Sequence, residues 1–359
     1  MIRSFTWLLI LLIGLSGLSA CLASNALPSI GRTQLVQLNS LGSRVQEYTI
    51  PHAAYVTDIA SGPDGDLWLT VGFATFNGIG EIAKISTTGS VTEYPNNCCI
   101  GCNFITPGPD GNMWFTCATS NPVPAAGAVF AITTSGQYLF PLGGGYASGR
   151  EYDGIVSGLD GNIYFVDEAA RCCGAPPQID GIDLHHGSQR FVVAQLPQDA
   201  SIQPVYLTQD EDNNLWFNNQ AFEGCAEMLK TTLGGKVSSY CVRPGQPNSG
   251  PVAVGSDGNI WFTERSTSKI GRITRAGKIR EFNIPSPALD ITPGPDGALW
   301  FTEMEKIGRI TTGGVVSEFN LPDDIQPKRL ITGPDHNIWF TEQQHFFQIS
   351  KKIGVLRLH

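Results

Sequence analysis

The stretch that decides the fold is Gly294-Pro295-Asp296-Gly297-Ala298-Leu299-Trp300-Phe301-Thr302-Glu303. Its first four residues predict a tight turn, because proline presets the backbone angle φ, aspartate can bond its own backbone, and glycine adopts a positive φ at little cost. The residues that follow are apolar on both faces, which is typical of a strand that is covered on both sides. The stretch therefore predicts a turn that leads into a buried strand.

Versions of this stretch recur along the whole chain. The aromatic residue is found at Trp68, Trp114, Tyr164, Trp216, Trp261, Trp300 and Trp339. The gaps between these residues are 46, 50, 52, 45, 39 and 39 residues. A period of this length is typical of a repeat architecture, in which stacked units cover each other's apolar faces.

The unit around Trp300 predicts four short antiparallel strands, which is the arrangement of a propeller blade. These strands are residues 290–292, 298–303, 306–311 and 315–321. With seven copies of the unit, the sequence predicts an all-β protein, a seven-bladed β-propeller of four-stranded antiparallel blades over residues 33–359.

The ends of the repeat region predict how the ring closes. Residues 34–51 resemble the third and fourth strands of a unit, since Val45–Pro51 matches Ile279–Pro285. We expect the N-terminal strand to pair with the last blade, which would remove an exposed sheet edge. Which of the two terminal strands lies outermost stays open.

The first 20 residues predict a signal peptide, with Arg3 as its positive region and the apolar run Leu8–Leu18 too short to span a bilayer. Leu18-Ser19-Ala20-Cys21 resembles the lipobox of bacterial lipoproteins. That resemblance implies lipidation of Cys21, followed by a linker over residues 21–32; the alternative is ordinary cleavage after Ala20. We expect a protein exported to the bacterial cell envelope as a membrane-anchored lipoprotein, or secreted.

Charge and composition limit the classes of partner. The formal net charge is −9 and the isoelectric point is about 5.1, so there is no basic surface for nucleic acid. An acidic protein is also not attracted to anionic lipids, which leaves the lipid anchor as its contact with a membrane. We expect a monomer whose partner is a small molecule or another protein of the envelope.

Two strings carry a resemblance to a known family. Gly255-Ser256-Asp257-Gly258-Asn259-Ile260-Trp261-Phe262-Thr263-Glu264 and Lys269-Ile270-Gly271-Arg272-Ile273-Thr274 resemble the repeat of the virginiamycin B lyase family. The resemblance covers about residues 34–358 and implies a seven-bladed propeller. It also implies a carbon–oxygen lyase that opens the lactone ring of streptogramin B antibiotics with the help of Mg²⁺.

The positions that carry the chemistry in that family are mostly replaced in this chain. A family histidine corresponds to Leu289, a Glu-x-His motif to Gln326-Pro327-Lys328, and a metal-binding glutamate to Gln343, with Glu342 one residue earlier. An elimination needs an acid or base that titrates near neutrality, and Mg²⁺ prefers carboxylate oxygens. We therefore expect a ligand-binding protein; the alternative is a metal-dependent lyase with a divergent site.

Acidic residues are predicted at the face where the strand following each turn ends. The candidates for a ligand face are Asp153, Asp167, Glu264, Asp290, Glu303 and Glu342. No cofactor follows from the sequence itself, but such a group could hold Mg²⁺ or another divalent cation. The other interpretation is a set of solvated strand ends, several of them paired with lysine or arginine.

Long loops are predicted at the same face in the first three blades, at residues 72–80, 118–127 and 169–178. Long loops on a rigid scaffold commonly carry recognition. The sequence therefore predicts that a ligand or partner binds through the loops of blades 1 to 3.

The eight cysteines after Cys21 predict disulfides, because the protein is expected to be exported. Cys225 and Cys241 fall on adjacent predicted strands of blade 4 and should cross-link them. Six more fall in blades 2 and 3 near the long loops: Cys98, Cys99, Cys102, Cys117, Cys172 and Cys173. Their spacing matches no closed zinc set, so we expect disulfides whose connectivity stays open.

Overall fold

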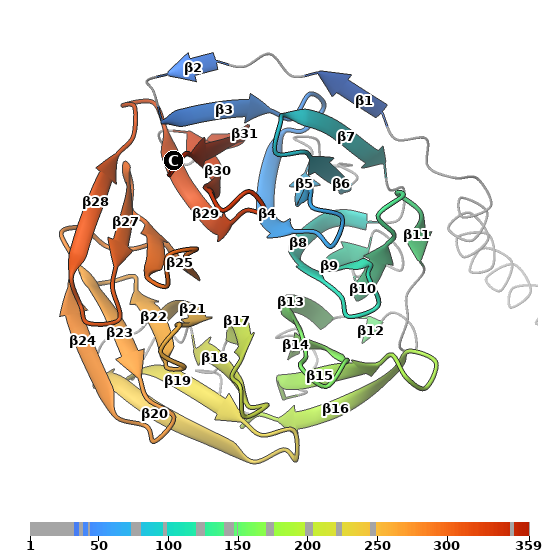
Figure 1. Cartoon of the computed structure of the whole chain (residues 1–359). Helices are drawn as coiled ribbons and strands as arrows, with labels where there is room; N and C mark the ends of the chain where they lie inside the picture. The colour runs from blue at the N-terminus through green and yellow to red at the C-terminus, as the bar shows by residue number, and fades with distance from the viewer. Residues whose placement is uncertain are drawn as a thin grey trace, which may run out of the picture.

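The structure, a computed structural model, describes residues 32–35, 39–41, 44–72, 80–95, 99–119, 126–139, 147–148, 150–169, 176–197, 204–219, 225–244, 249–344 and 348–358. Their strands form seven antiparallel sheets that surround a common centre as blades (Figure 1). The predicted all-β, seven-bladed propeller is confirmed. Among the same residues, no helix is long and apolar enough to cross a membrane.

Blades 1 to 3 follow one another around the ring, and each begins at the centre and runs outward (Figure 1). Blade 1 contains β4 (Tyr55–Ser61), β5 (Leu67–Gly72), β6 (Glu81–Ile85) and β7 (Ser90–Pro95), with β1 (Arg32–Leu35) added outside β7. Blade 2 contains β8 (Cys99–Pro107), β9 (Met113–Thr119), β10 (Ala126–Ile132), β11 (Tyr138–Leu139) and β12 (Ala147–Ser148), which also pairs with β10. Blade 3 contains β13 (Arg150–Ser157), β14 (Ile163–Ala169), β15 (Gln178–Asp183) and β16 (Gln189–Gln195).

Blades 4 to 6 repeat the same order with no added strand. Blade 4 contains β17 (Pro204–Gln209), β18 (Leu215–Asn219), β19 (Cys225–Thr231) and β20 (Val237–Pro244). Blade 5 contains β21 (Ser249–Val254), β22 (Ile260–Glu264), β23 (Lys269–Ile273) and β24 (Ile279–Asn283). Blade 6 contains β25 (Asp290–Pro293), β26 (Leu299–Thr302), β27 (Lys306–Ile310) and β28 (Val316–Asn320).

Blade 7 is built from both ends of the chain, so it closes the ring as predicted. From the centre outward it contains β29 (Gln326–Thr332), β30 (Ile338–Gln344), β31 (Gln348–Leu356), β3 (Val45–Thr49) and β2 (Asn39–Leu41). The N-terminal strand β3 therefore lies outside the C-terminal strand β31. The expectation that residues from 34 onward supply a third strand is wrong. That place belongs to β31, which follows β30 directly in the chain, whereas β1 lies on blade 1.

The repeated turn and aromatic residue form one packing unit in each blade. In blade 6 the indole Nε1 of Trp300 donates a hydrogen bond of 3.0 Å to Asp296 in the turn, and its ring stacks on Phe319 of β28 at 5.1 Å. A Cβ atom on Gly294 would lie only 2.0 Å from the Trp300 ring, so this position requires glycine. The repeat is thus explained by a buried indole that needs an acceptor and close backbone contact.

Candidate functional site

The innermost strands of six blades share the same interruption of regular strand pairing. In β29, Pro327 pairs with Glu342 and Leu330 pairs with Phe340, so Lys328 and Arg329 together oppose a single residue of β30. Comparable shifts of register occur in β4, β8, β13, β17 and β21. These are β-bulges, which bend a strand and change the direction of its side chains. Six blades therefore present residues to the centre through a bulge.

The backbone N–H groups that the bulges remove from the sheet are satisfied by one side chain of the neighbouring strand. Thr341 Oγ1 accepts the N–H of Arg329 at 3.2 Å, and Asn218 Oδ1 accepts the N–H of Tyr206 at 2.8 Å. The segment of β29 is also held by the preceding blade, because Thr302 Oγ1 donates to the carbonyl of Lys328 at 2.9 Å. The bulges are thus fixed by specific contacts.

One residue of each innermost strand, four positions before the first residue of the turn motif, forms a layer around the centre. The seven residues are Asp58, Phe104, Gly154, Tyr206, Pro251, Asp290 and Arg329. Arg329 is the one cation of this set. Its Nε lies 3.1 Å from Asp58 Oδ1 in blade 1, and its Nη1 lies 3.4 Å from Asp290 Oδ1 in blade 6.

Aromatic rings complete the surroundings of Arg329. Its guanidinium carbon lies 4.9 Å from the ring centre of Phe104 and 4.8 Å from that of Tyr206, and the two rings meet edge to face at 5.7 Å. Side chains of blades 1, 2, 4, 6 and 7 therefore meet around one guanidinium. Such a contact set combines ion pairing with cation–π attraction.

The two aspartates that hold Arg329 also bridge neighbouring blades. Asp58 Oδ2 accepts the N–H of Ile105 in blade 2, and Asp290 Oδ2 accepts the N–H of Leu330 in blade 7, both at 3.0 Å. Burial raises the pKa of both carboxyls, and Arg329 opposes that rise. Burial alone would lower the pKa of Arg329, but attraction to Asp58 and Asp290 outweighs it and raises that pKa. The arginine therefore stays charged.

Next to this layer lie further charged side chains. Lys328 is exposed at the surface. Its pKa is lowered, first by partial desolvation of the ammonium group and then by repulsion from Arg329 and Arg265. Arg265 is exposed and donates a hydrogen bond of 2.7 Å from Nη2 to the hydroxyl of Tyr206. The pKa of Asp153 in blade 3 is raised to about 6, first by burial and then by Glu151.

The predicted ligand-face glutamates lie inside their own blades. Glu264, Glu303 and Glu342 are 3%, 1% and 4% exposed. Beside each of them, a lysine of the third strand pairs with a glutamate of the fourth strand: Lys269 with Glu281 at 2.7 Å, Lys306 with Glu318 at 2.7 Å, and Lys352 with Glu47 at 2.8 Å. Asp167 is also buried and pairs with Arg190 of its own blade.

Two of these glutamates have strongly perturbed acidity. Burial, followed by the neighbouring Glu318, raises the pKa of Glu303 to about 7. Burial, followed by Glu47, raises the pKa of Glu342 to about 8. A carboxyl that is protonated near neutrality beside a second carboxylate is a poor ligand for a divalent cation.

The positions that correspond to the lyase residues do not form a set of metal ligands. Gln326 and Gln343 are directly paired across β29 and β30, Lys328 lies in the bulge, and the N–H of Leu289 donates to the carbonyl of Thr302. In the part of the chain that the structure describes, no group of three or more histidine, cysteine, aspartate or glutamate residues is arranged to hold a metal ion. The residues present therefore do not fit the Mg²⁺ that the family resemblance implies.

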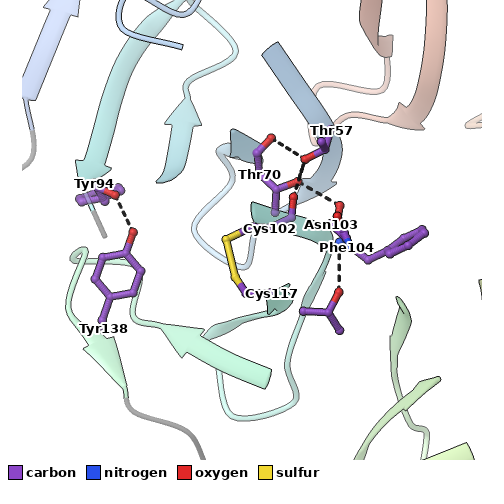
Figure 2. Close-up of a disulfide and its surroundings, with 9 residues drawn as sticks. Thr57, Thr70, Tyr94, Cys102, Asn103, Phe104, Cys117 and Tyr138 are labelled. Atoms are coloured by element: carbon purple, nitrogen blue, oxygen red, sulfur yellow. Dashed lines mark hydrogen bonds between the residues drawn. A yellow bond between two sulfur atoms is a disulfide. The ribbon is translucent and has the colours of Figure 1, made fainter. Parts of the chain in front are cut away.

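Two disulfides lie among the described residues. Cys225 and Cys241 cross-link β19 and β20, as predicted. Cys102 and Cys117 join β8 to β9 beside the bulge of blade 2, where Thr57 Oγ1 donates to the carbonyl of Cys102 at 2.8 Å (Figure 2). The side chains of Cys98, Cys99, Cys172 and Cys173 lie outside the described residues, as does Cys21.

From the sequence, Arg329 is expected only as a basic partner of the acidic residues, which its pairing with Asp290 confirms, and Tyr206, Phe104 and Arg265 are not expected at the site. The sequence contains the information needed to find this layer, because the turn motif aligns the innermost strands of the seven units. In that alignment a single arginine stands in a layer with two aspartates and two aromatic residues. The alignment does not reveal the bulge. A bulge allows consecutive residues such as Lys328 and Arg329 to lie on the same side of the strand.

The fold and its centre define a seven-bladed β-propeller whose innermost layer is held together by a half-buried arginine. Residues 189–354 match the model of the virginiamycin B lyase family. The chain is a virginiamycin B lyase-like propeller. A comparison with curated proteins found no match.

Solved structures agree with this assignment. A structure described as streptogramin B lyase is 24% identical, with 93% of this chain and 100% of that chain covered and a TM-score of 0.70. A catalytically inactive histidine-to-alanine variant of virginiamycin B lyase from Staphylococcus aureus, with quinupristin, is 27% identical, with 88% and 99% covered and a TM-score of 0.69.

Proposed function

We propose that the protein is an exported, lipid-anchored, monomeric propeller that binds a small molecule and does not open lactone rings. The ligand would bind at the face where the long loops of blades 1 to 3 leave the ring, with an envelope protein as the other class of partner. The observation that carries the proposal is the ion pairing of Arg329 with Asp58 and Asp290. Carboxylates held in this way are not available to a catalytic cation.

The chemistry of the lyase-like positions supports binding over catalysis. Leu289 and Gln326 have no acid or base function, and the glutamine at position 343 is a weak ligand for Mg²⁺. Glu342, which could replace the missing glutamate, is buried beside Glu47 with its pKa raised to about 8. None of these four side chains supplies a carboxylate that is ionised at neutral pH and accessible.

Export is supported by the disulfides Cys102–Cys117 and Cys225–Cys241, since such bonds persist in oxidising compartments. The proposed lipid anchor rests on the lipobox-like segment that ends at Cys21. Metabolic labelling with an alkyne fatty acid should mark the wild-type protein and not the Cys21→Ala variant. Equal labelling of both proteins would contradict the anchor at Cys21.

The absence of lyase activity is tested with purified protein, a streptogramin B and Mg²⁺, followed by mass spectrometry. We expect the antibiotic to stay intact. Formation of the linear product, abolished by Glu342→Ala, would instead establish a metal-dependent carbon–oxygen lyase with a divergent site. The 27% identity with virginiamycin B lyase over 88% of this chain is the observation that favours this second function.

Ligand binding itself is tested by the shift in melting temperature with a panel of neutral, cationic and anionic small molecules. We expect at least one class to stabilise the folded protein, because a ligand that binds only the native state raises its stability. If no class shifts the melting temperature, the small-molecule proposal fails and the envelope-protein class remains to be tested by cross-linking in intact cells.

A further inference from the structure

Three cations lie beside the aromatic residues at the centre of the ring. After burial, repulsion by Arg329 and Arg265 lowers the pKa of Lys328. The two nearest ion-paired acids, Asp58 and Asp290, are both bound to Arg329. Among the described residues, Arg265 and Lys328 therefore have no carboxylate partner, in a protein whose formal net charge is −9.

The two remaining cations are accessible and close to one aromatic ring. Arg265 and Lys328 are both exposed, and neither takes part in an ion pair among the residues that the structure describes. The guanidinium carbon of Arg265 lies 5.6 Å from the ring centre of Tyr206, whose other neighbour is Arg329 at 4.8 Å. Arginine offers five N–H donors, and within the described residues Arg265 uses one of them, on the hydroxyl of Tyr206.

The position of Lys328 is set by the fold and not by a surface loop. It lies in the bulge of β29, its carbonyl accepts the hydroxyl of Thr302, and the next residue is anchored by Thr341 and the two aspartates. A cation on a fixed backbone costs less entropy to organise for binding than one on a mobile loop. The backbone that carries this accessible charge is therefore held in place.

The acidic groups near this cluster lie in a different blade. Asp153 and the exposed Glu151 belong to β13 in blade 3, whereas Arg265 follows β22 in blade 5 and Lys328 lies in blade 7. Arg329 lowers the pKa of Asp153, which places that carboxyl within reach of the same centre. A bound anion would thus be attracted to the side of blades 5 and 7 and repelled by the side of blade 3.

We propose that the ligand of this propeller carries an oxyanion, a carboxylate or a phosphate, which binds to Lys328 and Arg265 with its apolar part against Tyr206. This inference rests on the proposed ligand-binding function and names the chemical class of the ligand. Lysine supplies a point charge and arginine a planar donor group for the two oxygens of the anion. The neighbouring ring provides the apolar contact.

Isothermal titration calorimetry with benzoate, benzamide and inorganic phosphate tests the proposal at constant ionic strength. Benzamide has nearly the shape of benzoate but no charge. We expect the wild-type protein to bind benzoate at least about tenfold more tightly than benzamide, since a charged hydrogen bond contributes about 1.5–3 kcal/mol. Lys328→Gln should weaken benzoate binding by at least about tenfold, and Lys328→Arg should restore most of it.

The matched control is Lys236→Gln, because Lys236 is exposed on the turn between β19 and β20 of blade 4. It should leave benzoate binding unchanged. Equal binding of benzoate and benzamide, or equal loss in both lysine variants, would overturn the oxyanion assignment. If the panel finds only neutral ligands, this inference fails while the ligand-binding function stands; if nothing binds, both fail. Phosphate binding without benzoate binding would assign the phosphate form of the ligand.

Discussion

The aspartate of each turn explains why the repeat is so regular at the residue scale. The indole N–H of a buried tryptophan must find an acceptor, and a carboxylate in a tight turn supplies it from four residues away in blades 1, 2, 5, 6 and 7. Blade 3 replaces the indole by the hydroxyl of Tyr164, which donates to Asp160. The turn therefore supports the core as well as the change of direction.

Replacing Asp296 by alanine should destabilise the protein by about 1–3 kcal/mol, because the N–H of Trp300 loses its acceptor in a buried site. Urea unfolding followed by fluorescence measures the change. Asp296→Asn is the control, since an amide oxygen can still accept the indole N–H, and it should cost less. Equal destabilisation by both substitutions would show that the charge, which also pairs with Arg309, matters more than the indole bond.

Arg329 is the residue on which the centre depends most. Arg329→Met should lower the free energy of unfolding by about 3–5 kcal/mol, because Asp58 and Asp290 would stay buried without their cation. Thermal unfolding measures the loss. Adding Asp58→Asn and Asp290→Asn to Arg329→Met should recover much of it. If the triple variant is no more stable than Arg329→Met, the destabilisation comes from lost aromatic contacts and not from unpaired acids.

At the element scale, the bulges change which residues of the innermost strands face the centre of the ring. The sequence predicts the strand and turn of each unit, because these depend on neighbouring residues such as Pro295 and Gly297. It does not predict that Lys328 and Arg329 both serve the centre, since an alternating strand would place them on opposite faces. The missing information is a register between two strands, which single-strand patterns do not contain.

The bulge in β29 should depend on the hydroxyl of Thr341, which accepts the N–H of Arg329 at 3.2 Å. Thr341→Val keeps the shape and removes the acceptor, so we expect a loss of about 1–3 kcal/mol in stability. Amide hydrogen exchange at residues 328–330 should accelerate more than exchange in blade 5. Thr341→Ser, which retains the hydroxyl, is the control; unchanged exchange in the valine variant would mean that the bulge does not need this bond.

At the scale of the whole molecule, the number of blades could be predicted but the assembly of the last one only in part. Val45–Pro51 matched a fourth strand because its own residues carry the pattern. The residues before Val45 resemble a third strand, but that place in blade 7 belongs to β31, whose first half is polar and lacks the repeat motif. The surroundings of Glu342 could not be predicted either, because its neighbours Lys352 and Glu47 form an ion pair between residues 305 positions apart in the sequence.

We expect ring closure to depend on pH, because two glutamates meet where the two ends of the chain join. Glu342 of β30 lies near Glu47 of the N-terminal strand β3, and its pKa of about 8 exceeds the ordinary value of 4.5. Between pH 4.5 and about 8, Glu342 is therefore protonated in the folded protein and ionised in the unfolded chain. The contribution of Glu342 to stability is complete below about pH 4.5 and is lost as the pH rises through about 8.

We expect the free energy of unfolding to fall by at most about 1.4 kcal/mol per pH unit in this window, and Glu342→Gln to flatten the profile. Urea midpoints from pH 5 to about 9 measure the slope, while hydrogen exchange in β3 reports on closure itself. Glu303→Gln is the comparison, because Glu303, with a pKa of about 7, lies in blade 6 away from the closure. It should reduce the slope without protecting β3 at high pH. If Glu342→Gln left both the slope and the exchange of β3 unchanged, the acid pair would have no part in holding the N-terminal strand.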